Sequence, residues 1–342
     1  MEEIQGAAEV AVRDMLKTIY KPTNGKPLEA VDYMDDGTAI QLKVTIDPST
    51  GGAIFNFEGT GPEAYGNWNA PIAICNSAII FALRCMVNMD IPLNQGAIRP
   101  IQVLIPDNSL LKPSPEAAVC AGNVLTSQRI VDVIFKAFNA VAASQGCMNN
   151  LTFGTDDAEN GFGYYETICG GSGGGPSWNG TSGVHTNMTN TRITDPEILE
   201  RRYPVILRQF CLREGSGGEG WHPGGDGIIR DIEFSIPIKV SILSERRAVR
   251  PYGLEGGGDG KRGENLWIKK SGRVINLGGK NTAMMDAGDR IVIQSPGGGA
   301  WGKKNSATSA LALANGLVNT KNAFIGASNG TVNILQSMGE TA

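Results

Sequence analysis

The chain of 342 residues is 41% hydrophobic and 19% charged, which is sufficient for the core of one large or two modest domains. Its formal net charge of −4 argues against nucleic acid or an anionic membrane as a partner, because both require a basic face. No apolar run approaches membrane-spanning length, the acidic helical start does not resemble a signal peptide, and the six scattered cysteines contain no CxxC pair. We therefore expect a cytoplasmic protein with reduced, mostly buried thiols.

Helices are expected mainly in the first half of the chain, where apolar residues recur at helical spacing. The expected helices run from 4 to 20, from 71 to 88 and from 123 or 126 to 141. The second helix begins with a proline, and the third begins at Asn123 or Thr126. All three residue types favour the beginning of a helix. Alternating apolar residues predict strands at 39–46, 53–57 and 101–105, the first two joined as a hairpin.

Short strands that alternate with glycine-rich loops are expected beyond Asn150. The candidates are residues 164–168, 205–212, 228–234, 239–243, 266–269 and 290–294. Helices followed by strands predict an α+β fold with short mixed or antiparallel strands, and not repeating βαβ units. Residues 303–342 are rich in Ala, Ser and Asn, and we expect them to form a peripheral tail.

Glycine is the outlier of the composition. Of the 46 glycines, 24 fall in four tracts, at residues 170–183, 215–227, 253–263 and 295–302. Glycine at this density costs folding entropy, so it is expected where the backbone approaches a ligand or adopts positive φ. The alternative is that the tracts are turns of an irregular β protein, and the sequence leaves both open.

Two phosphate-binding signatures match by residue type but not by context. GxGxxG occurs at 215–220 and at 258–263, yet a helix follows neither, so dinucleotide binding is not expected. A near Walker A run at 297–303 places Lys304 where the residue that ligates Mg²⁺ should stand. We do not expect a phosphate loop there.

A serine hydrolase is the strongest rival among the standard signatures. GxSxG at 170–174 follows an expected strand, and His185 and Asp195 lie downstream. A nucleophile elbow must lead directly into a helix, however, and the glycines and Pro176 that follow Ser172 forbid one. The signature therefore does not predict a catalytic serine.

The chain contains only two histidines, His185 and His222, and both lie beside glycine tracts. A structural role is the default for each, while acidic and hydroxyl neighbours leave a role in a site open. Two histidines and scattered carboxylates have no metal-ligand spacing, so no metal is expected to bind this chain.

The most informative stretch is NMTNTRITDPE at residues 187–197, which is dense in hydroxyl, amide and charged groups. It has little apolar surface to bury, so we expect it to be held by hydrogen bonds beside a ligand or an interface. Its Thr-Asn-Thr run offers short donors and acceptors, and Arg192 offers a planar fork for a carboxylate. Asp195 and Glu197 have an alternative interpretation as a helix cap.

Further motifs accompany this stretch over about 300 collinear residues. They are MEEIQGAAEVAVRDML (1–16), YMDDG (33–37), GTGPEAYGNWNAP (59–71), IPLNQGAIRPI (91–101), GNVLTSQR (122–129), GCMNNLTFG (146–154), YYETICGG (164–171), RYPV (202–205), SILSERR (241–247) and SPGGGAWG (295–302). Together they closely resemble the C-terminal half of the hydantoinase B/oxoprolinase family, and within it the eukaryotic 5-oxoprolinase branch. The resemblance assigns residues 1–302 to the C-terminal portion of that family's domain, a fragment of a larger B-type module.

The resemblance implies an ATP-dependent hydrolase of cyclic amides that opens the lactam of 5-oxo-L-proline to L-glutamate, a step of glutathione metabolism. An A-type module would use ATP to activate the lactam, and the B-type module would complete the reaction. ATP and a divalent metal are implied for the complete enzyme, but this chain alone is expected to bind neither and to be inactive, because the family's metal ligands lie in an upstream segment.

The implied partners are that upstream segment, the A-type module and further copies in a homo-oligomer. Two alternatives stay open. The chain is either a non-catalytic structural portion of the module, or part of a related hydantoinase or ketone carboxylase.

Two sets of candidate site residues follow from the resemblance and from the chemistry of the side chains. The expected catalytic residues are His185, Asn190, Asp195 and His222. The expected substrate-binding residues are Thr189, Thr191, Arg192, Arg213, Gly217, Gly218 and Asp226. The arginines would clamp the substrate carboxylate, and the amides of the glycine tracts would stabilise an oxyanion. His222 and Asp226 match an HxGGDG pattern of the family. A histidine often precedes the methionine of the Thr-Asn-Thr motif, and here Asn187 stands in that place, so the resemblance carries no proton-transfer role to it.

Overall fold

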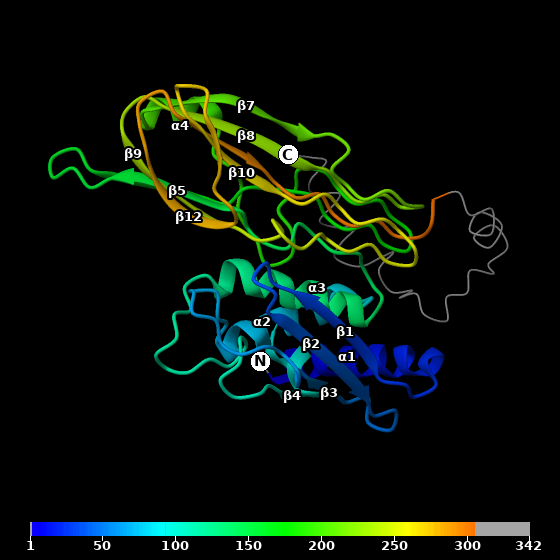
Figure 1. The fold of residues 1–342 in the computed structure, drawn as a ribbon. Helices are drawn as coiled ribbons and strands as arrows, with labels where there is room; N and C mark the ends of the chain where they lie inside the picture. The colour runs from blue at the N-terminus through cyan, green and yellow to red at the C-terminus, as the bar shows by residue number, and fades with distance from the viewer. Residues whose placement is uncertain (1, 93, 305–342) are drawn as a thin grey trace. The chain divides into compact units, whose positions relative to one another are not determined.

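The structure is a computed structural model that describes residues 2–92 and 94–304 (Figure 1). It divides into two compact units, of which the first ends at Val141 and the second runs from Ala142 to Lys303. The tail expected at 303–342 lies, apart from its first two residues, outside the described residues. No helix in the described ranges has the length and apolar character needed to cross a bilayer.

The first unit combines three α-helices with one four-stranded sheet. The helices are α1 (Glu2–Thr23), α2 (Ile72–Met86) and α3 (Ser127–Ala137), with short helical turns at Gln95–Ile98 and Gly122–Thr126. The strands are β1 (Leu28–Tyr33), β2 (Ala39–Ile46), β3 (Ala53–Asn56) and β4 (Ile101–Leu104), in that spatial order. Only β3 and β4 pair in parallel among these strands.

The expected apolar periods are confirmed in this unit. Along β2 the buried and exposed residues alternate, because successive side chains of a strand point to opposite faces. On α1 the buried face contains Ala8, Val12 and Met15, as the helical spacing predicts. Helix α3 ends at Ala137, earlier than expected, because Asn139 adopts a φ of 48°.

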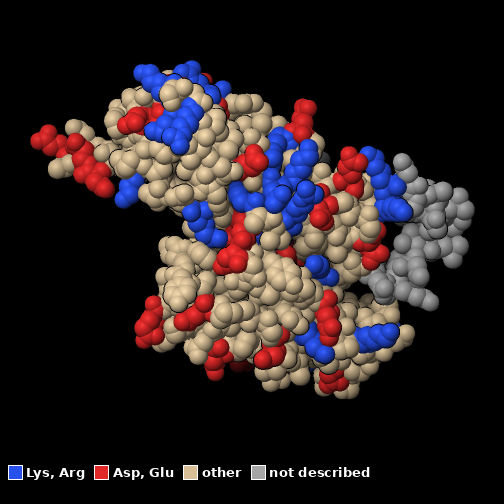
Figure 2. Space-filling model, viewed as in Figure 1, with Lys and Arg blue, Asp and Glu red and all other residues tan. Residues whose placement is uncertain are grey.

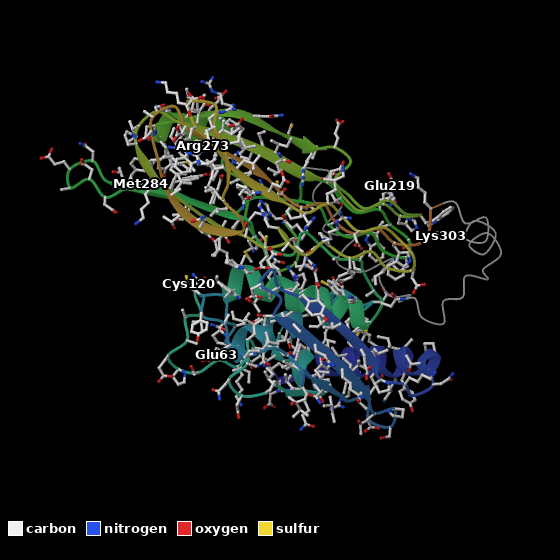
Figure 3. All side chains as sticks on the ribbon, in the orientation of Figure 1. Glu63, Cys120, Glu219, Arg273, Met284 and Lys303 are labelled. Atoms are coloured by element: carbon white, nitrogen blue, oxygen red, sulfur yellow. The ribbon has the colours of Figure 1, made fainter. Side chains whose placement is uncertain are left out.

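Residues of two polar motifs in this unit stabilise the fold. The loop at 59–71 folds around the fully buried Asn69, whose side-chain amide bonds the carbonyls of Ala64, Gly66 and Ala118. Glu63, labelled in Figure 3, accepts a hydrogen bond from the Ser114 amide at 2.7 Å and so joins this loop to the next. In GNVLTSQR the buried Arg129 lies 3.7 Å from Asp32, which joins α3 to β1.

The second unit is built from two antiparallel sheets and one short helix, α4 (Pro196–Arg202). The five-stranded sheet has the order β11 (Val274–Asn276), β10 (Glu264–Ile268), β13 (Arg290–Gln294), β8 (Gly227–Phe234) and β7 (Val205–Arg213). The four-stranded sheet has the order β12 (Lys280–Met285), β9 (Ile238–Leu243), β5 (Asn150–Thr155) and β6 (Phe162–Glu166). All of these strands pair antiparallel, which is one of the two arrangements expected for the second half of the chain.

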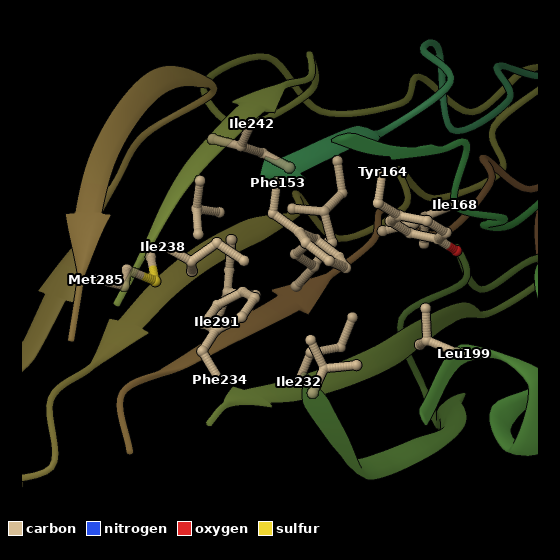
Figure 4. Packing of buried hydrophobic residues seen from close by; sticks show 14 of the residues in the cluster. Phe153, Tyr164, Ile168, Leu199, Ile232, Phe234, Ile238, Ile242, Met285 and Ile291 are labelled. Carbon is tan, nitrogen blue, oxygen red and sulfur yellow. The ribbon is translucent and has the colours of Figure 1, made fainter. Parts of the chain in front are cut away.

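The inner faces of the two sheets share one apolar core, shown in Figure 4. Phe153 of β5 packs edge-to-face against Phe234 of β8 with ring centroids 5.5 Å apart, and Ile291 and Ile238 are fully buried in the same core. Apolar faces that meet in this way define a β-sandwich. The β5–β6 hairpin extends beyond it with an acidic tip, the red projection at the left of Figure 2.

The four glycine tracts run side by side at one end of the sandwich, and we call them the glycine bundle (residues 170–183, 215–227, 253–263 and 295–302; Figure 1). Backbone hydrogen bonds cross between them, such as Gly298 N–H to Gly225 C=O at 2.8 Å and Gly218 N–H to Gly298 C=O at 2.8 Å. A Cβ at Gly298 would lie 1.9 Å from the Ser172 carbonyl oxygen, so no larger residue has room there. The glycines thus permit backbone to pack on backbone.

Candidate functional site

The polar stretch at 187–197 lies alongside β6 and leads into α4. The hydroxyls of Thr191 and Thr167 form a short hydrogen bond, and Thr194 Oγ1 lies 2.8 Å from the hydroxyl of Tyr164. At the start of the stretch, Asn187 Nδ2 donates to Ser144 Oγ at 3.2 Å. The expected hydrogen bonds are therefore present, and they tie the stretch to the edge of the sandwich.

Two of the predicted residues in this stretch remain exposed between these attachments. Neither Asn190 nor Arg192 makes a hydrogen bond or ion pair with another residue in the described ranges, and both are solvent-exposed. The pairing of Arg192 with Asp195 or Glu197, which would make it a structural brace, does not occur. Thr189 is half-buried and its amide donates to the Thr186 carbonyl at 3.0 Å. The arginine fork is thus available to a ligand.

Asp195 caps α4. Its side chain accepts hydrogen bonds from the amides of Glu197 at 2.9 Å and Ile198 at 3.3 Å, and Pro196 occupies the first turn. This is the helix-cap alternative that the sequence left open for Asp195, and it uses the carboxylate that the catalytic prediction needs. Glu197 contributes only its amide to the cap.

A buried ion pair lies beneath the same stretch. Arg230 of β8 donates to Glu166 of β6 from Nε at 2.7 Å and from Nη2 at 3.0 Å, and both side chains are buried in the sandwich. The hydroxyl of Tyr164 donates to Glu166 Oε2 at 2.6 Å. Burial, and then the neighbouring Glu166 carboxylate, raise the pKa of Tyr164, so its hydroxyl stays protonated. The sequence did not predict this ion pair. Tyr164 and Glu166 were noted only as members of the YYETICGG motif, and Arg230 was not noted.

The two histidines have different surroundings. His185 is half-buried, its Nδ1 has no hydrogen-bond partner, and burial lowers its pKa below the ordinary 6.5. His222 belongs to the glycine bundle, where its Nδ1 lies 3.2 Å from Asn179 Oδ1 and its backbone pairs with Trp301. Burial lowers the pKa of His222 as well. Both imidazoles are therefore held toward their neutral form.

The remaining predicted residues brace the glycine bundle. Asp226 accepts a hydrogen bond from the Gly217 amide at 2.7 Å, and the Gly218 amide donates to the Gly298 carbonyl. Because both amides have protein acceptors, the geometry does not favour either as an oxyanion donor. Arg213 donates to the carbonyl of Arg262 at 2.6 Å, and burial lowers its pKa. Its guanidinium is thus engaged with backbone.

The three rejected signatures also lie in the bundle. Gly299 of the Walker-like run donates to the Ala143 carbonyl at 2.8 Å, and Ser172 Oγ of the GxSxG match accepts from the Thr181 amide at 2.7 Å. These groups do not fit a phosphate loop or a nucleophile elbow. No grouping of three or more His, Cys, Asp or Glu in the part of the chain that the structure describes could hold a metal ion. Among the described residues, the Walker-like run therefore does not offer a phosphate loop, and no metal-ligand grouping is found.

A second polar network, which sequence reasoning also missed, joins the motifs at 146–154 and 241–247. Arg247 donates to Asn149 Oδ1 at 2.6 Å and to Asn265 Oδ1 at 2.9 Å, and Asn149 Nδ2 donates to Gln145 Oε1 at 2.6 Å. Asn149, Gln145 and Asn265 are fully buried. Buried polar groups require partners, and the amide and arginine letters of these two motifs were the only signal in the sequence.

The profile described as hydantoinase B/oxoprolinase matches residues 1–304. The chain belongs to this family. It is 57% identical over 312 residues to 5-oxoprolinase 1 of Arabidopsis thaliana, a match that covers 88% of this chain and 24% of the relative. It is 52% identical over 318 residues to the 5-oxoprolinase of Saccharomyces cerevisiae, covering 89% of this chain and 25% of the relative. The chain thus spans about a quarter of the length of these relatives.

A solved structure supports the fold assignment. The crystal structure of an ATP-dependent caprolactamase from Pseudomonas jessenii superposes with a TM-score of 0.76 at 20% identity, over 95% of this chain and 60% of that one. At this identity the likeness concerns the fold alone. The α+β class of the chain is therefore shown.

Proposed function

We propose that this chain forms the C-terminal part of the B-type module of an ATP-dependent 5-oxoprolinase, which opens the 5-oxo-L-proline lactam to L-glutamate. The identity of 52–57% with proteins named 5-oxoprolinase in three organisms supports this substrate over a hydantoin or a ketone. A Pseudomonas protein named as a putative D-/L-hydantoinase component is only 26% identical to the chain. In this proposal ATP, the divalent metal and the A-type module belong to the rest of the enzyme, in the cytoplasm and within a homo-oligomer.

Arg192 is the residue through which this chain would bind substrate. Its guanidinium is exposed and unpaired, while Thr191 and Thr194 on either side are tied to β6 and its end. A planar fork held at a fixed position matches the two oxygens of a carboxylate, and 5-oxoproline carries one carboxylate. Arg192 is therefore the carboxylate clamp, with Asn190 beside it as a second polar contact.

A second candidate function is structural support without a substrate contact. The specific observation in its favour is that Asp195, Asp226, Gly217, Gly218 and His222 all have bonds within the protein. In that case Arg192 would also be dispensable for substrate binding.

The test is a chimera in which this chain replaces the matching segment of the Saccharomyces cerevisiae enzyme. The chimera should hydrolyse 5-oxoproline with ATP. In it, Arg192→Lys keeps the charge but loses the fork, and should raise KM by a factor equivalent to about 1–3 kcal/mol. Arg201→Lys, on the exposed side of α4, is the matched control and should leave KM unchanged. A folded but inactive chimera would contradict the proposed function, and an unchanged KM for Arg192→Lys would support the structural candidate.

A further inference from the structure

The buried pair of Glu166 and Arg230 has no part in the proposed substrate contact. Both residues face the inside of the sandwich, where their neighbours Ile228, Ile232 and Tyr164 are buried in the apolar core. Taking two charges out of water is expensive, and well-packed apolar residues in their place are often as stable. The pair therefore calls for an explanation beyond stability.

The pair is one end of a hydrogen-bond chain that reaches the polar stretch. Arg230 binds both oxygens of Glu166, and Tyr164 donates its only hydroxyl proton to Glu166 Oε2 at 2.6 Å. The phenol oxygen must then accept from Thr194, whose Oγ1 lies 2.8 Å away. A hydrogen bond to an ionised carboxylate is stronger than one between neutral groups. The buried end of this series of hydrogen bonds, at Glu166, is therefore its strongest part.

We propose that Tyr164, Glu166 and Arg230 are positioning residues, which hold the stretch around Arg192 in one conformation through Thr194. The stretch has a second attachment at Thr191, so Arg192 lies between two fixed points. A guanidinium that is ordered before a ligand arrives loses less conformational freedom on binding. The inference rests on the proposed function only for the identity of the ligand as a carboxylate.

The first test uses the chain by itself and measures the position of the stretch directly. Trypsin cleaves after exposed arginines when the backbone around them opens locally. Tyr164→Phe removes the hydroxyl and keeps the ring, so cleavage after Arg192 should accelerate by roughly five- to tenfold, the loss of about one hydrogen bond. Thr194→Val should have a similar effect, and the double variant should add nothing further, because both substitutions break the same bond between Tyr164 and Thr194.

Tyr203→Phe is the matched control. The ring of Tyr203 lies 4.9 Å from that of Tyr164 in the same aromatic cluster, and its hydroxyl makes no hydrogen bond within the described residues. It should leave cleavage after Arg192 unchanged. Equal cleavage rates in the parent, Tyr164→Phe and Thr194→Val would overturn the inference, and so would an equal acceleration in Tyr203→Phe.

The second test separates this inference from the proposed function. In the active chimera, Tyr164→Phe should raise KM for 5-oxoproline with little change in kcat, since the clamp loses its fixed position. Faster cleavage with an unchanged KM would support the positioning role and contradict the carboxylate clamp at Arg192. A lowered melting temperature without faster cleavage would overturn the positioning role.

Discussion

At the scale of single residues, three of the polar side chains predicted for the site, Asp195, Asp226 and Arg213, bond to backbone in the structure. Asp226 bonds the Gly217 amide and Arg213 bonds the Arg262 carbonyl, each within or beside the glycine bundle. Backbone N–H and C=O groups that are buried away from water require hydrogen-bond partners. In the glycine bundle, whose tracts do not pair as regular strands, side chains provide some of these partners. Such residues are therefore needed for the fold before any catalytic role is considered.

Gly298 gives a prediction at this scale. A Cβ there would meet the Ser172 carbonyl oxygen at 1.9 Å, and that oxygen belongs to backbone and not to the end of a flexible side chain. Gly298→Ala should therefore lower the free energy of unfolding by roughly 3 kcal/mol, measured by denaturant titration. Gly163→Ala is the control, because nothing lies within 4 Å of its added Cβ. A stable Gly298→Ala variant would mean that the bundle is packed less closely than described.

The histidines give a prediction about pH. Burial lowers the pKa of His185 and His222 below the ordinary 6.5, so the folded state binds fewer protons than the unfolded state. Stability should be fully present above pH 6.5 and should fall as the pH drops below it toward the folded pKa values. Melting curves from pH 8 to pH 5 should show the decline, and the double variant His185→Gln with His222→Gln should show a smaller one. An equal decline in both proteins would assign it to other groups.

At the scale of elements, α4 tests the role of Asp195. A capping side chain satisfies amides of the first helical turn, and its loss costs about 1 kcal/mol. Asp195→Ala should therefore lower stability by about that amount, while Asp195→Asn should keep it, because asparagine caps equally well. In the chimera, Asp195→Asn should also keep its activity. A large loss of kcat in a stable Asp195→Asn variant would restore the catalytic interpretation.

At the scale of the whole molecule, the chain should be inactive by itself. The amides of the Walker-like glycines are engaged with backbone carbonyls, and the described residues offer no metal-ligand grouping. Purified residues 1–342 should therefore release neither ADP nor glutamate in the presence of ATP and 5-oxoproline, whereas the chimera should release both. Release of ADP that depends on oxoproline from the chain alone would place the ATP site within it.

The sequence by itself determined the family and the elements with a strong local period. The apolar face of α1 and the alternation along β2 were predictable because each depends on neighbours a few residues away. The strands β5 and β12 were not predicted, since NLTFGT and KNTAMM are partly polar and become strands by pairing with β9 between them.

The tertiary structure alone decided what the glycines and the polar residues do. Glu166 meets Arg230, and Gly298 meets Ser172, only because strands and tracts far apart in the sequence lie side by side. The sequence does not distinguish a glycine that makes room for a ligand from one that makes room for another backbone segment. Nor does it distinguish an aspartate that caps a helix from one that takes part in catalysis. Only the partners that folding brings to each residue distinguish these roles, because a side chain's chemistry depends on which groups surround it.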